Sequence, residues 1–399
     1  MNRSAALLRG GATALILVVG FVAGLYVDQA FPDYVPYFGH RSTSRIDLRV
    51  VEEAARLIQA DYVDTSIDTR KLSQGSVQGL VNGLGDPYTM YYDPDQYKKL
   101  QQSYQSRFTG IGIYLTFGTG YPVISATVPG SPAAAAGLQR GDQIVKVGDR
   151  DIKGITADEA TALIQGPEGS KVRLTISRDG QTMTFTITRA QIVVPTVRSA
   201  TVGNHVLYVR IYQFSANTAS DFKAQLRAGL PGSEGMILDL RGDPGGFVSA
   251  ADEVITQFVT SGETFETHGR SGVDRHQVGS QHAAPNVPLV VLVDGNSASA
   301  AEIVAGSLQV HRRAKLVGTR TFGKGSVQED FALSDGSDLH LTVERWFLPD
   351  GQTIDHKGLS PDVTVTLSNP SDAFDVAQPS QGYAKDAQLN AALTLLAGG

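Results

Sequence analysis

Apolar residues early in the chain recur at the spacing of a helix. In segment 46–62 the residues that share one helical face are Ile46, Val50, Ala54, Leu57 and Ile58. Segment 71–84 repeats the pattern until Gly85-Asp86-Pro87 stops it, and a shorter helix is expected over 93–104. These elements predict a small helical region over residues 45–107, acting as a structural cap or as the contact of a homodimer.

From residue 108 the hydrophobic pattern changes to the alternation that is typical of strands. The expected strands are 109–115, 123–128, 141–147, 171–177 and 182–188. A short helix is expected after Pro129, and an amphipathic helix over 156–165 begins with Thr156 and Glu159 as a capping box. The order over residues 108–190 is therefore β-β-short helix-β-helix-β-β.

The first of these strands begins in a glycine-rich loop, Gly110-Ile111-Gly112-Ile113. Together with Ser131-Pro-Ala, Ala136-Gly-Leu and Gly141-Asp, the order of elements resembles a PDZ domain. Such a domain binds the C-terminus of a peptide as an added strand, and the amides of its glycine-rich loop hold the terminal carboxylate. The glycines let backbone N–H groups converge on an anion, although an ordinary hairpin turn would also contain them.

Strands and helices alternate over residues 191–368. Strands are expected at 191–197, 205–211, 235–240, 288–293, 314–317, 338–347 and 361–367, and helices at 248–259 and 298–310. Strands that alternate with helices predict an α/β domain with a mainly parallel sheet. Residues 369–399 are expected to form a linker and a short amphipathic helix, which is either a docked tail or a dimer contact.

The N-terminal pattern is that of an exported protein. Arg3 and Arg9 precede residues 10–27, a run of about 18 residues without charge that is long enough to span a bilayer. We interpret residues 1–9 as cytoplasmic, 10–27 as a single-pass anchor in the cell membrane and 28–44 as a linker. The remainder would then lie outside the cytoplasm. The alternative is a cleaved signal peptide and a secreted or periplasmic protein.

Composition excludes several classes of protein. The formal net charge of −6 offers no basic face for nucleic acid. The chain has no cysteine, which rules out disulfides, cysteine-based zinc sites and a cysteine nucleophile. It also has no His-Glu-x-x-His motif, and we expect neither a metal nor another cofactor.

A serine at the start of the 298–310 helix is the candidate nucleophile. Ser299 and Glu302 form the pattern of a capping box, so capping alone would explain this serine. The start of a helix nevertheless offers free amides and a positive dipole end, which suit a developing oxyanion. A serine also needs a base, and none of the eight histidines shares a motif with a serine and an acid. His356 beside Asp355 fits a surface turn better.

Lys324 is the remaining candidate base, 25 positions after the serine (324 − 299) in the turn Thr321-Phe-Gly-Lys-Gly325. A lysine acts as a base only when it is neutral, and burial favours the neutral form. A lysine exposed on a turn is the alternative. Segment 318–325 also approaches a phosphate-binding loop, but Gly325 stands where that loop needs serine or threonine to hold magnesium. We therefore do not expect a nucleotide.

Three stretches resemble the carboxyl-terminal processing proteases, the tail-specific serine peptidases. They are Asn296-Ser-Ala-Ser-Ala-Ala-Glu302, Thr321-Phe-Gly-Lys-Gly-Ser-Val-Gln328 and Asp239-Leu-Arg-Gly-Asp-Pro-Gly-Gly246. The resemblance extends from about Ile46 to Leu367. It implies a multi-domain α/β protein with a helical N-terminal region, a PDZ domain and a peptidase core with a mixed sheet of the ClpP/crotonase type.

The resemblance also implies roles for individual residues. On the family's pattern Ser299 is the nucleophile, Lys324 is the general base, and Gln328 orients the lysine. The oxyanion hole would consist of the Ala300 amide and one glycine of the pair at 245–246, for which we prefer Gly246. The implied enzyme is a serine endopeptidase that recognises protein substrates by free, apolar C-termini. A non-catalytic PDZ scaffold on the same fold is the competing hypothesis.

Two residues depart from the family's pattern. Ala301 stands where the family usually has serine, and Asp243 stands where it usually has asparagine. Neither residue is expected to carry the reaction. We expect the Asp243 carboxylate to face solvent rather than to influence the oxyanion hole.

Overall fold

The computed structural model describes residues 46–105, 107–117, 120–128, 130–369, 372–377 and 379–398. The chain divides between Ser76 and Val77 into two compact units. The expected anchor at 10–27 lies outside the described residues, and no helix of the described part is long and apolar enough to cross a membrane. Domain boundaries at 45, 108 and 191 remain predictions.

The first described elements are helical, as expected. They are α2 (Arg49–Asp61) and α3 (Thr69–Asn82). No residue of α2 is buried. Several large apolar side chains in and beside this helix are exposed, namely Ile46, Leu48, Val50, Val51, Leu57, Ile58, Tyr62 and Val63. The helical face that the sequence predicts is thus present, and a homodimer contact through it remains a prediction.

The second helical segment continues into the larger unit. After α3 a turn leads to β1 (Met90–Tyr92), and α4 (Pro94–Tyr104) follows. Asp93 caps α4 through a capping box with Gln96, with Pro94 in the first turn.

The PDZ-like part has the predicted order of elements with one addition, the short strand β6, and the first predicted strand begins only at Ile113. Its strands are β3 (Ile113–Thr116), β4 (Val123–Thr127), β5 (Gln143–Val147), β6 (Arg150–Asp151), β7 (Lys171–Arg178) and β8 (Gln181–Thr188), and its helices are α5 (Pro132–Ala135) and α6 (Ala157–Ile164). The sheet order is β3-β4-β5-β7-β8, with β6 beside β5. A separate pair joins β2 (Arg107–Gly110) to β9 (Ala190–Val193). Alternating apolar residues such as Ile144, Leu174 and Ile176 fill the core.

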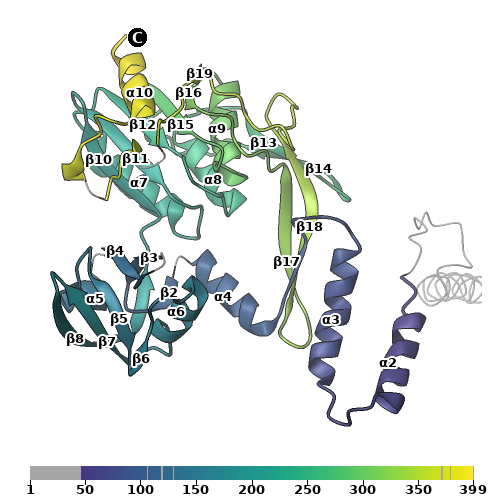
Figure 1. Ribbon diagram of the computed structural model, residues 1–399. Helices are drawn as coiled ribbons and strands as arrows, with labels where there is room; N and C mark the ends of the chain where they lie inside the picture. Colours follow the sequence, from purple (N-terminus) through teal and green to yellow (C-terminus); the bar gives the residue numbers. More distant parts are fainter. Residues whose placement is uncertain are drawn as a thin grey trace, which may run out of the picture. The chain divides into compact units, whose positions relative to one another are not determined.

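The peptidase core contains a six-stranded mixed sheet, in agreement with the predicted fold class (Figure 1). Its order is β10 (Val197–Val202), β11 (Val206–Ile211), β12 (Gly235–Asp239), β15 (Leu289–Val293), β16 (Lys315–Gly318) and β19 (Val363–Thr364). Only β10 and β11 pair antiparallel within this sheet. The core strands are buried on both faces, and their continuous apolar runs reflect this position.

Helices cover the two faces of this sheet. One face packs against α7 (Thr218–Gly229), α8 (Val248–Thr256) and α9 (Ala300–Val310). The other packs against α10 (Ala387–Ala397). Successive residues of β11 show why: Leu207 and Val209 belong to the first cluster and Tyr208 to the second.

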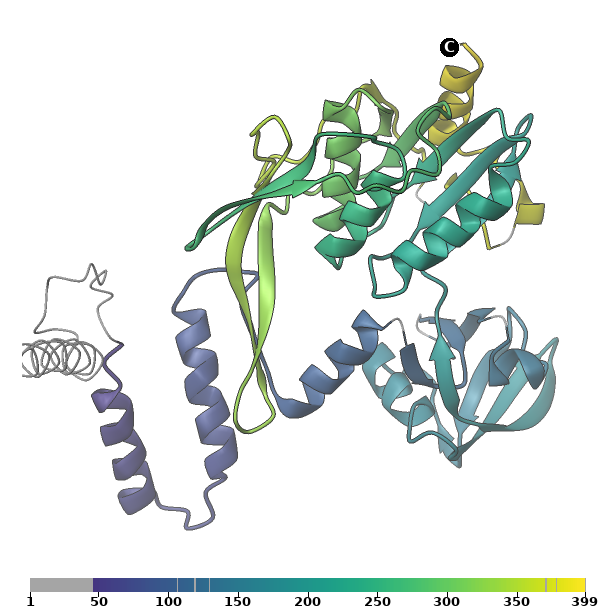
Figure 2. The ribbon, with the colours of Figure 1, turned by 180° about the vertical axis from the view of Figure 1, so that it is seen from behind.

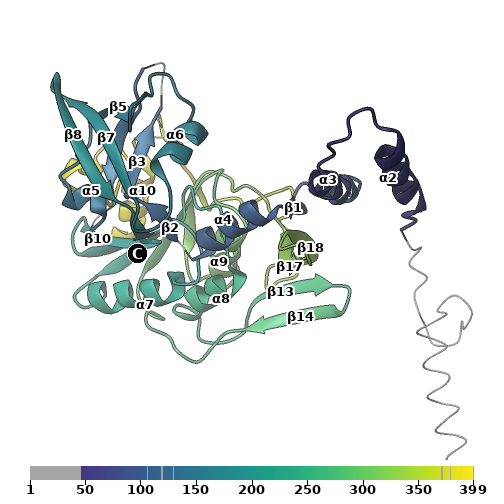
Figure 3. The same cartoon turned by 90° about the horizontal axis from the view of Figure 1, so that it is seen from below.

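A second sheet lies beside the helices of the core. Its order is β1-β18-β13-β14, where β13 is Glu263–Gly269, β14 is Gly272–Gln277 and β18 is Asp338–Phe347. β17 (Ser326–Ala332) also pairs with β18, and the two strands form a long ribbon (Figure 2). The hairpin of β13 and β14 forms a second ribbon near α8 (Figure 3). Neither α7, β17 nor this hairpin was predicted from the sequence.

The segment before α10 is more than the expected linker. Phe374 and Val376 are buried in the core cluster beneath α10. Arg241, at the end of β12, forms ion pairs with Asp239 and with Asp386, which caps α10. The Ser-, Pro- and Asp-rich composition suggested a linker, but the two apolar side chains Phe374 and Val376 pack this segment against the core.

Candidate active site

Ser299 stands at a sharp turn between a buried strand and a helix. β15 ends at Val293, and α9 begins at Ala300. Ser299 has φ +54° and ψ −117°, a backbone conformation that side chains other than glycine rarely adopt. The residue is buried, with an exposed fraction of 7%. A serine in such a turn is held rigidly at the edge of the sheet, which is the setting of a nucleophile.

The carboxylate of Glu302 is the hub of this region. It is fully buried and accepts four hydrogen bonds. The donors are Ser299 N at 2.9 Å, Thr321 Oγ1 at 2.5 Å, Gly323 N at 2.8 Å and Lys324 N at 2.9 Å. Burial raises the pKa of Glu302, and these hydrogen bonds oppose the shift. The sequence suggested only a capping role for this residue, because the turn at 321–324 is remote along the chain.

Lys324 lies in a turn whose shape depends on its flanking glycines. A Cβ at Gly323 would lie 2.7 Å from Gly358 N, and one at Gly325 would lie 2.5 Å from the Asp355 Cβ. The Lys324 carbonyl accepts the indole N–H of Trp346 at 2.9 Å. The turn is therefore packed closely against residues 355–358 and β18, which fixes the backbone of the lysine.

The Lys324 side chain is partly buried, as a lysine base requires. Burial lowers its pKa, and the nearby Asp86 carboxylate opposes the shift. The ammonium lies 5.1 Å from the centre of the Tyr88 ring. Within the described residues, no hydrogen bond joins Ser299 Oγ to Lys324 Nζ.

Gln328, the predicted partner of the lysine, lies on β17 near the start of the ribbon. Its amide donates to Ser326 Oγ at 2.9 Å and to Thr342 Oγ1 at 3.0 Å. Gln328 lines the same cleft as Lys324. Its side-chain amide, however, already donates to two hydroxyl groups. The structure brings the three side chains together without linking Gln328 to the lysine.

The backbone N–H groups of Gly246 and Ala300 are the candidates for an oxyanion hole, and the neighbouring Gly245 lies close to the Ser299 turn. Gly245 has φ +95°, and a Cβ there would lie 2.8 Å from the Ser299 Cβ and 2.9 Å from Ala300 N. The Gly245 N–H is already engaged, since it donates to Asp243 Oδ1 at 2.8 Å. Among the described residues, the N–H groups of Gly246 and Ala300 have no acceptor. This difference supports our preference for Gly246 over Gly245.

The expectation that Asp243 faces solvent is wrong. This side chain is fully buried, and its backbone carbonyl accepts the N–H of Ala298 at 2.9 Å. Oδ1 holds the Gly245 amide, whereas Oδ2 has no hydrogen-bond partner among the described residues. Burial raises the pKa of Asp243 well above its ordinary value. The turn after β12 folds inward against the Ser299 turn, which the local sequence did not reveal.

The candidate residues share one cleft of about 590 Å³. Its walls include Gly245, Gly246, Ser299, Lys324 and Gln328, together with Tyr104 and the ribbon residues Glu329, Asp330 and His340. His356 lies outside it and is 77% exposed, as a surface turn predicts. The described residues contain no group of three acidic or imidazole side chains that could hold a metal ion.

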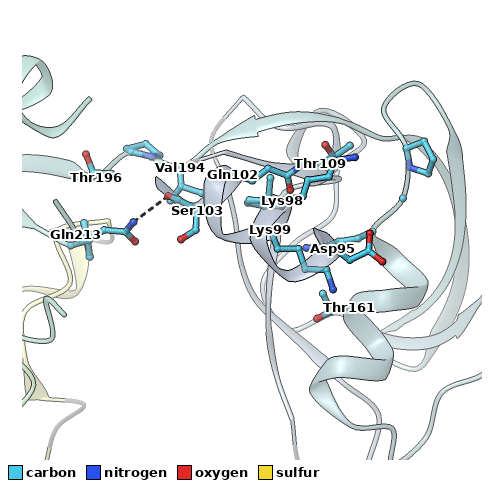
Figure 4. A pocket seen from close by; sticks show the side chains of 16 residues that line it. Asp95, Lys98, Lys99, Gln102, Ser103, Thr109, Thr161, Val194, Thr196 and Gln213 are labelled. Atoms are coloured by element: carbon cyan, nitrogen blue, oxygen red, sulfur yellow. Dashed lines mark hydrogen bonds between the residues drawn. The ribbon is translucent and has the colours of Figure 1, made fainter. Parts of the chain in front are cut away.

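A larger cavity, of about 1010 Å³, lies elsewhere (Figure 4). It is lined by α4, β2, the end of α6 and the segment 194–196, and Gln213 donates to the Ser103 carbonyl at its edge at 3.2 Å. None of Ser299, Lys324 and Gln328 lines it. The candidate catalytic residues therefore line the smaller of these two cavities.

The glycine-rich loop of the PDZ-like part has the geometry of an anion site. Gly112 has φ +81°, and a Cβ there would lie 2.3 Å from the Ser131 Cβ. The carbonyls of Ile111 and Gly112 accept hydrogen bonds from Ala133 N and Val128 N. Among the described residues, the N–H groups of Ile111 and Gly112 donate to no backbone or side-chain acceptor. Gly110 is the last residue of β2, and Ile113 is the first residue of β3. These two residues of the predicted peptide-binding loop therefore flank the N–H groups of Ile111 and Gly112.

An α/β core with this cleft, on the same chain as a PDZ fold, defines a serine peptidase with a peptide-binding module. Residues 205–365 match peptidase family S41, residues 123–178 match a PDZ domain, and residues 38–96 match the N-terminal domain of the activating protease CtpB. The chain belongs to family S41 and is a carboxyl-terminal processing protease with a substrate-binding PDZ domain.

Several relatives are similar over most of the chain. The carboxy-terminal processing protease CtpA of Bacillus subtilis is 35% identical over 334 residues, which cover 82% of this chain and 72% of that protein. The carboxyl-terminal-processing protease of Synechocystis is 35% identical and covers 86% of this chain and 81% of its own.

Solved structures show the same fold. The photosystem II D1 C-terminal processing protease is 29% identical, with a TM-score of 0.50 over 79% of this chain and 92% of that one. A putative S41 protease from Bacteroides fragilis shares the fold at 19% identity, with a TM-score of 0.56 over 90% of this chain and 99% of that one. The predicted family and fold class are thus confirmed.

Proposed function

We propose that this protein is an exported serine endopeptidase in which Ser299 and Lys324 form the catalytic dyad. The observation that carries the proposal is the shared acceptor, Glu302 Oε2, to which the backbone N–H groups of both residues donate at 2.9 Å. A buried carboxylate that holds two remote turns in register would place the nucleophile and base with little freedom.

The chemistry follows the roles of these groups. Neutral Lys324 accepts the proton of the Ser299 hydroxyl as the serine oxygen attacks the scissile carbonyl. The carbonyl oxygen becomes an oxyanion, which receives hydrogen bonds from the N–H groups of Gly246 and Ala300. Lys324 then gives its proton to the leaving amine, and water hydrolyses the acyl-enzyme.

Substrate selection would begin at the PDZ domain. The amides of Ile111 and Gly112 would bind the terminal carboxylate, and the substrate tail would add as a strand beside β3. Apolar side chains at the C-terminus of the substrate would contact apolar side chains of the PDZ domain. Partners are therefore protein or peptide substrates with free, apolar C-termini.

Export remains part of the proposal. The arginines before residues 10–27 and the uncharged run itself support a single-pass membrane protein whose catalytic part lies outside the cytoplasm. A secreted or periplasmic form after signal cleavage is the alternative, and the exposed apolar residues of α2 support a homodimer.

The dyad is tested with the full-length chain, purified in detergent, and an unstructured protein with an apolar C-terminus. Cleavage should be lost in Ser299→Ala and in Lys324→Ala, while both variants still bind the tail. A substrate with a C-terminal carboxamide should be cleaved more slowly, because the amide cannot replace the terminal carboxylate. Cleavage that persists in both variants would exclude the dyad, and tail binding without cleavage by the unaltered protein would favour a scaffold.

A further inference from the structure

The turn formed by residues 86–89 is closed by its own hydrogen bonds and fixed to the ribbon. Asp86 Oδ1 accepts the Tyr88 N–H at 3.0 Å, and Asp86 Oδ2 accepts the Thr89 hydroxyl at 2.7 Å. Thr89 is buried, and its Oγ1 accepts the N–H of Thr342 on β18 at 3.1 Å. The turn is therefore an ordered element whose side chains have defined positions.

This turn presents an aromatic face to the candidate base. The Lys324 ammonium lies 5.1 Å from the centre of the Tyr88 ring, within the roughly 6 Å range of cation–π attraction. The two residues are 236 positions apart (324 − 88), so only the fold brings them together. The ring attracts the charged form of the lysine and has no comparable attraction for the neutral amine that catalysis needs.

Thr342 connects the turn to the predicted partner of the lysine. Its N–H donates to Thr89, and its hydroxyl oxygen accepts a hydrogen bond from Gln328. In this arrangement the Lys324 ammonium lies over the Tyr88 ring, and the Gln328 amide donates to the hydroxyl groups of Thr342 and Ser326. Thr342 on β18 is thus hydrogen-bonded both to the turn that carries Tyr88 and to Gln328.

We propose that Tyr88 is a positioning residue of the general base, whose ring holds the Lys324 ammonium in a resting arrangement from which it must move to act on Ser299. The inference rests on the proposed role of Lys324. The dyad hypothesis does not include the turn at residues 86–89. The inference adds this turn to the residues that position the general base.

Several other titratable or charged groups lie around Lys324, and their effects must be separated from the effect of the ring. They are Asp86 in the turn, Glu302 on α9, Asp355 beside Gly325, Arg345 on β18, and the cleft residues Glu329, Asp330 and His340. Burial lowers the lysine pKa and Asp86 raises it. Replacing Tyr88 changes none of these charges, so a shift in the lysine's titration would report the ring.

The direct test measures the protonation of Lys324 without relying on activity. Full-length Ser299→Ala protein is labelled with acetic anhydride over a range of pH, and labelling of the Lys324 peptide is followed by mass spectrometry. Adding Tyr88→Leu should move the titration midpoint down by about half to one pH unit, the size of a cation–π contribution. Tyr88→Phe keeps the ring and should keep the midpoint. Tyr62→Leu, at a tyrosine that is 56% exposed, is the matched control.

A structural role for Tyr88 would give a different result. It would lower the unfolding temperature without moving the midpoint, and this outcome would overturn the proposal. An equal shift in Tyr88→Phe would also overturn it. If Tyr88→Leu does not fold, Tyr88→Met offers a longer, unbranched and more flexible apolar side chain without a ring, and it should show the same downward shift.

The pH profile of cleavage separates this inference from the dyad itself. In the active protein, Tyr88→Leu should move the acid limb of kcat/KM to lower pH by the same amount as the labelling midpoint. An unmoved midpoint with Lys324-dependent cleavage would refute the positioning role and leave the dyad intact. A moved midpoint with cleavage independent of Lys324 would refute the dyad and leave the contact intact.

Discussion

Ser299 and Lys324 donate their backbone N–H groups to the same oxygen atom, Glu302 Oε2, each at 2.9 Å. This shared acceptor joins the start of α9 to the turn before β17. The other carboxylate oxygen accepts from Thr321 and Gly323, so the whole turn is tied to one buried side chain. The relative position of the proposed nucleophile and base therefore depends on a residue that has no proposed part in bond making.

The Glu302→Gln variant should lose most of its activity. An amide offers one acceptor oxygen, and its NH₂ group would face N–H donors that now bind the carboxylate. We expect kcat to fall by at least about 100-fold and the free energy of unfolding to fall by about 2–4 kcal/mol. Peptidase assays and urea unfolding measure both. Glu234→Gln, at an exposed position, is the control, and near-normal kcat in Glu302→Gln would contradict the prediction.

Replacing Ser299 by glycine should stabilise the protein relative to Ser299→Ala. Both variants lack the nucleophile and should be inactive, but only glycine adopts φ +54° and ψ −117° without strain. We expect Ser299→Gly to be more stable than Ser299→Ala by about 1 kcal/mol in urea unfolding. Equal stability would show that the turn relaxes in the alanine variant.

Gly245→Ala should greatly slow cleavage by distorting the proposed oxyanion hole. The new Cβ would lie 2.7 Å from the Ala298 carbonyl oxygen and 2.8 Å from the Ser299 Cβ. A displaced turn would move the Gly246 amide, and loss of one oxyanion donor costs about 100- to 1000-fold in kcat. Gly351→Ala is the matched control, because Gly351 also has a positive φ, of 78°, but nothing lies within 4 Å of its added Cβ. Activity retained in Gly245→Ala would argue against this oxyanion loop.

Asp243→Asn should stabilise the protein at neutral pH. In the unfolded chain this carboxyl ionises near pH 4, whereas burial raises its pKa well above that value in the folded chain. The folded state thus binds more protons between these two pKa values, and stability is lost as the pH rises through that window. Asparagine keeps an oxygen for the Gly245 N–H and cannot ionise.

Urea unfolding at about pH 4, 6 and 8 measures this difference. The gain from Asp243→Asn should be near zero at the lowest pH and reach about 1–3 kcal/mol at the highest, the cost of a buried group without a partner. Asp274→Asn, at a side chain that is 77% exposed, should show no such trend. A pH-independent difference between Asp243→Asn and the unaltered protein would contradict the explanation.

Most of the architecture followed from local patterns. Alternating and helical spacing identified the PDZ order, the strands of the α/β core and the short C-terminal helix, because each depends on residues that are neighbours along the chain. The hairpin of β13 and β14 was missed because its exposed strand carries few apolar residues. The helix α7 was missed because its buried positions are few: Thr218, Phe222 and Leu226.

The candidate catalytic residues were likewise identified from short motifs, since a serine at a helix start and a lysine between glycines are local features. The partners that control them are not local. Glu302 meets the lysine turn, Asp243 is buried against the serine turn, and Tyr88 lies under the lysine only after distant segments pack together. Burial and contact between such segments are properties of the folded chain, so the sequence motifs identified the candidate reacting groups, whereas tertiary packing determined their environment.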